Sequence, residues 1–154
     1  MYQTLIPFHS IFRWLLVTSL AYAIIKSIIG LTAKSPYSKL DNIVRSATSA
    51  ISHIQLIIGF ILYFKSPIVS YFREKGSETL RYTDIAFFSV FHIAFMVIAI
   101  LLITIGAAKA KRATTDYDKH NQTFWWFGFA ALLIFLAIPW PFNPYVSRPY
   151  FRFF

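Results

Sequence analysis

Four long apolar stretches, separated by short polar ones, dominate the sequence. They lie at about residues 7–31, 43–64, 83–108 and 122–138. A helix of about 20 apolar residues can cross a hydrocarbon core of about 30 Å. Because a helix also satisfies its own backbone hydrogen bonds, the pattern predicts an all-α, integral membrane four-helix bundle with up-down topology.

Proline and glycine mark the ends of the predicted helices. Pro7 fits the first turn of the first helix, where its missing N–H costs no hydrogen bond. Gly30 and Pro36 end that helix, Pro67 follows the second, and Pro139 breaks the fourth. The segment that follows Pro67 can form a short amphipathic piece in the membrane interface.

The tail at residues 139–154 is rich in proline, arginine and aromatic residues, so we expect it at the headgroup level. The chain has 154 residues and no internal repeat, which predicts a single transmembrane domain over 1–154. Lys and Arg are more frequent around 26–45 and 109–119 than in the other connections. The positive-inside rule therefore places those two regions in the cytoplasm and both termini on the outer side.

The composition excludes several classes of protein and of cofactor site. Only 14% of the residues are charged, against about 25% in a typical soluble domain. The net charge of +9 comes from basic residues that flank the apolar stretches, which indicates lipid headgroups rather than nucleic acid. The chain has no cysteine, which excludes disulfides, iron–sulfur clusters and covalent c-type haem attachment. The stretches hold no carboxylate except Asp84 at a boundary, which excludes a carboxylate-bridged di-iron site.

Three of the four histidines, His9, His53 and His92, lie inside predicted membrane helices. Polar side chains at membrane depth are costly and usually mark function. At about 1.5 Å per residue, we expect His9 roughly 5 Å, His92 roughly 12 Å and His53 roughly 17 Å deep. Neutral imidazole ligates haem iron, so two of these histidines can hold one haem b between facing helices.

The favoured pair of haem ligands is His53 and His92, with His9 as the competing ligand. Helices joined by one loop tend to be neighbours, and an unpaired imidazole is hardest to explain at the depth of His53. On a neighbouring strip of the same helix, Gln55 can orient an imidazole. Arg13 lies one turn after His9 and can neutralise a haem propionate.

Other interpretations remain open. The three imidazoles can instead bind copper or zinc, or surround a quinone headgroup. They can also only bridge helices, in a structural or assembly subunit of a larger membrane complex. Arg13 can snorkel to headgroups, and His120, in a polar run, is expected to be a solvated loop residue. The phenylalanine-rich fourth helix can support a homo-oligomer or face lipid.

Four segments carry a family resemblance: FHSIFRW at 8–14, HIQLIIG at 53–59, ITIG at 103–106 and IPWPF at 138–142. Together they resemble a family of small bacterial four-helix membrane proteins commonly labelled cytochrome b, over nearly the whole chain. The resemblance implies a haem-binding electron carrier of the bacterial inner membrane. Our hypothesis is that it passes electrons between the quinone pool and a partner protein, either alone or as an oxidoreductase subunit. It maps onto His9, Arg13, His53 and His92.

Overall fold

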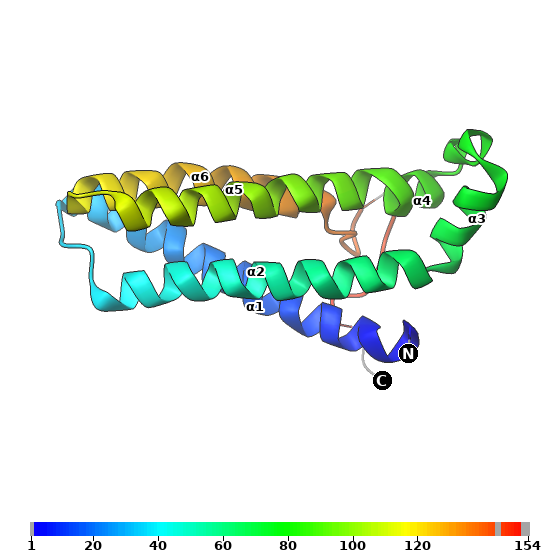
Figure 1. Ribbon diagram of the computed structural model, residues 1–154, viewed down its shortest axis with the longest axis horizontal. Helices are drawn as coiled ribbons and strands as arrows, with labels where there is room; N and C mark the ends of the chain where they lie inside the picture. Colours follow the sequence, from blue (N-terminus) through cyan, green and yellow to red (C-terminus); the bar gives the residue numbers. More distant parts are fainter. Residues whose placement is uncertain (1, 144–145, 152–154) are drawn as a thin grey trace.

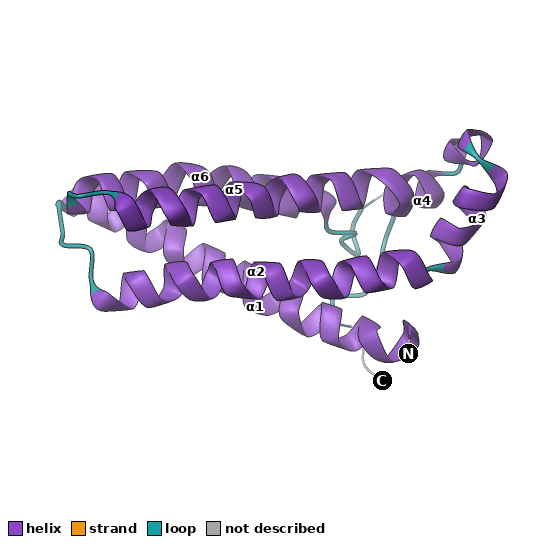
Figure 2. Cartoon of the chain, viewed as in Figure 1, coloured by secondary structure: helices purple, strands orange, loops and turns teal. Residues whose placement is uncertain are grey.

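The computed structural model describes residues 2–143 and 146–151, and over these residues the chain is all-helical without a strand (Figure 2). Four long helices lie side by side: α1 (Tyr2–Ala33), α2 (Lys39–Lys65), α5 (His92–Arg112) and α6 (Asp116–Ala137) (Figure 1). α1 packs mainly against α2 and α6, and α5 packs mainly against the same two helices. As a result, α1 and α5 are diagonally opposed across the interior.

Polar caps set the starts of two helices. Asp41 N–H donates to the Ser38 hydroxyl, and Ser38 N–H donates to the Asp41 carboxylate, which together form a capping box. At α6, the Thr115 hydroxyl accepts the N–H of Asp118. These caps explain why α2 and α6 begin several residues before the predicted starts at 43 and 122.

The third predicted helix is a continuous run with an irregular turn near its start. It consists of α4 (Thr83–Ala86), the π-helical turn η2 (Phe87–Phe91) and α5. A single π-helical turn inside an α-helix changes the direction of the side chains after it and often occurs at functional sites. Here it directly precedes His92.

Three helical segments in the described part of the chain are long and apolar enough to cross a membrane. They are Tyr2–Ala33, Lys39–Lys65 and Thr83–Arg112. α6 is not one of them, because its first two turns are filled by the polar residues 116–123. The fourth membrane crossing and the orientation of the termini stay predictions.

The connection between α2 and α4 contains α3 (Pro67–Lys75) and the 3₁₀ helix η1 (Ser77–Arg81). The predicted short piece after Pro67 is therefore helical, and Val69 on it is almost completely buried. Figure 1 shows α3 at the same end of the molecule as the N-terminus.

The described part of the tail folds back onto α1. Trp14 Nε1 donates to the Tyr150 carbonyl at 2.9 Å, and Val146 is buried. Trp14 also packs edge-on against Trp140 and stacks on Phe151. The predicted tail includes residues 144–145 and 152–154, which lie outside the described residues.

The buried core lies where α1, α5 and α6 meet. Its residues are mostly aliphatic: Leu16, Leu20, Ala23, Ala99, Ile103, Ala107, Phe127, Ala130, Ile134 and Ile138. Many large apolar side chains on the outer faces of the helices are exposed, among them Ile57 and Leu101. Exposed faces of this kind are compatible with contact with a lipid bilayer.

Candidate functional site

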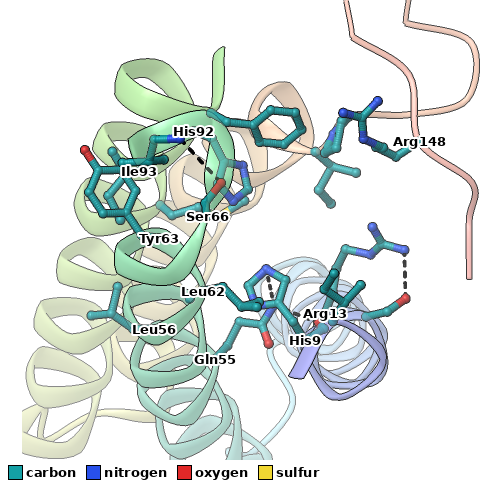
Figure 3. Close-up of a pocket in the computed structure, with 18 of the residues that line it drawn as sticks. His9, Arg13, Gln55, Leu56, Leu62, Tyr63, Ser66, His92, Ile93 and Arg148 are labelled. Atoms are coloured by element: carbon teal, nitrogen blue, oxygen red, sulfur yellow. Dashed lines mark hydrogen bonds between the residues drawn. The ribbon is translucent and has the colours of Figure 1, made fainter. Parts of the chain in front are cut away.

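A cavity of about 180 Å³ lies between the helices (Figure 3), and Tyr2 and Val69 of α3 are among the residues that line it. Its polar side chains come from α1, α2, α5 and the tail, and include His9, Arg13, Gln55, His92 and Arg148. The apolar part of its lining includes Leu16, Leu56, Leu62, Phe88, Ile93, Met96, Ile100 and Ile138. An apolar cavity with a few convergent polar groups is the usual form of a ligand site.

A backbone contact fixes the tautomer of His92. His92 Nδ1 lies 2.8 Å from the Ala137 carbonyl oxygen. A carbonyl only accepts hydrogen bonds, so Nδ1 carries the proton and Nε2 keeps its lone pair. Histidines that ligate a metal through one ring nitrogen commonly donate a hydrogen bond from the N–H of the other, and this bond orients the ring.

Gln55 holds His9 in place. Its amide nitrogen donates to the His9 carbonyl at 3.0 Å and lies 3.3 Å from His9 Nε2. An amide nitrogen only donates, so Nε2 accepts and Nδ1 carries the proton. Within the described residues, His9 Nδ1 and Gln55 Oε1 are buried without a hydrogen-bond partner. Metal ligation through His9 Nε2 therefore requires that Gln55 keep only its bond to the His9 carbonyl.

His9 and His92 approach each other from the diagonally opposed helices. Their ring centroids lie 6.4 Å apart, with an angle of 63° between the ring planes. A metal–imidazole bond is about 2.0–2.1 Å long, so two imidazoles on opposite sides of one metal have ring centroids roughly 6 Å apart. The separation of the pair matches that requirement.

Two arginines line the cavity on the same side (Figure 3). Arg13 donates to the Ser10 hydroxyl at 3.3 Å and to the Tyr150 carbonyl, while its Nε is buried and has no hydrogen-bond partner among the described residues. Arg148 lies over the Phe88 ring, with its guanidinium carbon 5.1 Å from the ring centroid. No Asp or Glu is among the described residues that line this cavity, so neither guanidinium meets a carboxylate there.

His53 is not among the described lining residues of the cavity. It is exposed, and its Nε2 lies 2.9 Å from the Thr104 hydroxyl oxygen. Because that hydroxyl donates to the Ile100 carbonyl at 2.7 Å, His53 Nε2–H is the donor to Thr104. Two residues along a helix turn through about 200°, so Gln55 faces inward while His53 faces outward. The structure therefore brings together His9 and His92, the competing pair, rather than His53 and His92.

The expectation for His120 is wrong. His120 lies on α6 with 1% of its surface exposed, and both ring nitrogens lack a partner among the described residues. A Cβ added at Gly30 would lie 2.3 Å from His120 Cδ2, so the ring fills the space beside that glycine. The Tyr37 ring covers His120 at a centroid distance of 4.8 Å.

A signal for His120 is present in the sequence. The buried residues of α6 are His120, Thr123, Phe127, Ala130, Ile134 and Ala137. Their spacing of three or four residues is that of one helix face, and it continues back through the polar turns to His120. Arg148 was also missed, because no local pattern links a tail residue to α1.

Tyr37, in the connection between α1 and α2, belongs to the same buried region as His120. Its hydroxyl lies 3.4 Å from the Thr123 hydroxyl oxygen and donates to the Asp41 carbonyl at 3.4 Å. Burial raises the pKa of the Tyr37 phenol above its ordinary value, and the hydrogen bond with Thr123 offsets part of that change.

Comparison of the chain with protein-family models, with curated proteins and with solved structures finds no match. In the described part of the chain, no three His, Cys, Asp or Glu side chains gather as a metal site. The family resemblance of the sequence therefore stays an expectation that rests on its motifs.

Proposed function

We propose that this protein is a membrane b-type cytochrome, in which His9 and His92 ligate one haem and electrons pass between the quinone pool and a redox partner. The observation that carries the proposal is the 6.4 Å separation of the two imidazole centroids across the cavity. His9 and His92 would be the two side chains that hold the haem iron, and two protein ligands suffice for a haem. A bare zinc ion takes three or four protein ligands, and the described residues offer no third side chain of this kind.

The chain's own residues have clear roles in this proposal. His92 presents an unprotonated Nε2, and its bond to the Ala137 carbonyl makes the ring a better electron donor. Gln55 positions His9 through the His9 carbonyl. Gly59 adjoins His9 without a side chain, since a Cβ there would lie 3.5 Å from His9 Cε1. Bound haem would supply a one-electron carrier in a largely apolar setting.

A quinone headgroup is the second candidate ligand. A cavity of about 150 Å³ is known to hold benzene, so about 180 Å³ accommodates a single ring without rearrangement. A quinone carbonyl would also accept the buried, unpartnered N–H at His9 Nδ1.

The test compares haem content in three histidine variants. His9→Ala and His92→Ala are expected to lose the reduced-minus-oxidised haem b spectrum at equal protein level. His53→Ala is the matched control and should retain it, because His53 contacts Thr104 instead of the cavity. Loss of haem in His53→Ala with retention in His9→Ala would overturn the proposed pair. Wild-type protein that binds no haem but binds a soluble quinone would favour the second candidate.

The proposed setting is a bacterial inner membrane that the chain crosses four times, with α6 as the fourth span and both termini outside. The three long apolar helices support it, as does the excess of basic residues in the regions 26–45 and 109–119. A reporter fused after Phe154 should read as periplasmic, and one inserted near Thr115 as cytoplasmic. The reverse readings would overturn the orientation.

A further inference from the structure

Among the described residues that line the cavity, no carboxylate is present to neutralise its two arginines. Arg13 comes from α1 and Arg148 from the tail, and both are half-buried. The described groups that meet them are neutral: the Ser10 hydroxyl and the Tyr150 carbonyl for Arg13, and the Phe88 ring and the Ser147 carbonyl for Arg148. A half-buried cation is costly without an anion, and the described lining provides none.

The position of the two charges adds a constraint on shape. Both guanidinium groups lie on one side of a cavity whose remaining lining is mainly apolar (Figure 3). Arg13 Nε is buried and donates to no described residue, so this N–H is available to a ligand. Guanidinium groups match carboxylates because both are planar and can form two parallel hydrogen bonds.

We infer that Arg13 and Arg148 bind two carboxylate groups at one edge of a flat, otherwise apolar ligand. This inference rests on the proposed function, because haem carries two propionates at one edge of its ring, and it adds the tail as part of the site. It also predicts specificity: a ligand of the same shape without the carboxylates should bind more weakly. A lipid phosphate is the competing source of an anion for the two arginines.

The experiment titrates detergent-purified apo-protein with haemin and with haemin dimethyl ester, which has the same ring and iron but no free carboxylates. Charge-assisted hydrogen bonds predict that the wild type binds haemin about tenfold or more tightly than the ester. Arg13→Gln and Arg148→Gln should each weaken haemin binding about tenfold and leave ester binding unchanged. Arg81→Gln, in η1 and outside the described lining, is the matched control.

Metal-free protoporphyrin IX and its dimethyl ester, followed by quenching of tryptophan fluorescence, give a second measure without iron ligation. Equal binding of acid and ester in both series would overturn the inference, leave the haem proposal intact and assign the arginines to headgroups. Arginine-dependent preference for the free acid of protoporphyrin, without an imidazole-ligated haemin spectrum, would support the inference and contradict the haem proposal. Binding of neither compound would overturn both.

Arg13 also contacts the tail, so loss of its side chain can disturb the fold. Arg13→Lys keeps the charge and should bind haemin with an affinity between those of the wild type and Arg13→Gln. The comparison is made only between variants whose circular dichroism shows the same helix content as the wild type. If Arg13→Lys binds haemin no better than Arg13→Gln while both fold, charge at Arg13 does not hold the ligand.

Discussion

Histidines line the interior at both ends of the helices, but the two ends are packed differently. The end with His9 and His92 encloses a cavity of about 180 Å³, whereas the space beside His120 is about 10 Å³, enough for one water at most. A Cβ at Gly59 would make an ordinary 3.5 Å contact with His9, but a Cβ at Gly30 would lie 2.3 Å from His120. A histidine that fills space is part of the packing, whereas one that borders empty space is available to a ligand.

The two ends also differ in their charged groups. Near His120, the buried Arg45 donates to the Ala107 carbonyl at 2.8 Å and to the Asn42 side chain at 3.2 Å, and Asp41 lies close by in its capping box. That end therefore contains acidic and basic groups together. The cavity end has two arginines and, in its described lining, no acid.

The largest expected effect is stabilisation of the folded protein by haemin, the ligand that we propose for the cavity. With free haemin at a hundred times its Kd, linkage predicts that the free energy of unfolding rises by about 2.7 kcal/mol. Thermal unfolding in detergent with and without haemin measures the change. His92→Ala should abolish it. An equal rise in His92→Ala would mean that haemin binds elsewhere on the protein.

The end that holds His120, which we call the tight end, should be destabilised by one added methyl group. Gly30→Ala places a Cβ 2.3 Å from two atoms of the His120 ring, and overpacking of this kind costs about 1–3 kcal/mol. Chemical unfolding of the variant measures the loss. Gly128→Ala is the matched control, because a Cβ there meets nothing within 4 Å. The double variant Gly30→Ala/His120→Ala should show positive coupling, and strict additivity of the two changes would contradict the contact.

The long helices could be predicted from the sequence, because an apolar run of membrane length can satisfy its backbone hydrogen bonds within a bilayer by forming a helix. Their starts could not, because Ser38 and Thr115 cap helices through side-chain hydrogen bonds that hydropathy does not register. The segment after Pro67 was expected as a short amphipathic piece, and it is the helix α3, whose first turn is capped by the Ser66 hydroxyl accepting the Val69 N–H.

Of the residues proposed from the sequence for the site, His9, Arg13, Gln55 and His92 line one cavity, whereas His53 is not among its described lining residues. The estimate of depth assumed that the first helix begins at Pro7, whereas it begins at Tyr2. His9 then lies about 10 Å along α1, close to the value of about 13 Å for His92 along the run from Thr83. Depth alone did not choose between His9 and His53; His53 was favoured because its imidazole was expected to lack a partner at that depth, but the Thr104 hydroxyl is that partner.

Arg148 shows the other limit of sequence reasoning. Its place in the cavity depends on the tail returning to α1, where the Tyr150 carbonyl accepts from Trp14 and Arg13. Contacts between residues about 135 positions apart leave no periodic signal in the chain.

A smaller change in the free energy of unfolding is expected from the same glycine-to-alanine change at the cavity end, which holds His9 and His92. Gly59→Ala should stabilise the apo-protein by about 0.5–1 kcal/mol, since alanine favours the helix and its Cβ meets His9 at a normal distance. Chemical unfolding beside Gly30→Ala makes the comparison direct. A loss of more than about 1 kcal/mol would show that this end is packed as tightly as the other.

The smallest effect concerns alkaline pH at the tight end. Burial raises the pKa of Tyr37, so the folded protein holds the phenolic proton more tightly than the unfolded chain does. The resulting stability is complete below the unfolded pKa of about 10 and is lost as the pH rises through the folded value. Tyr37→Phe removes two long hydrogen bonds of 3.4 Å, so it should cost only about 0.5 kcal/mol at neutral pH. Above about pH 10, the variant should lose less stability than the wild type, and unfolding measured from pH 8 to 11 tests this. Parallel curves for the two proteins would show that the Tyr37 phenol is as accessible to water in the folded state as in the unfolded chain.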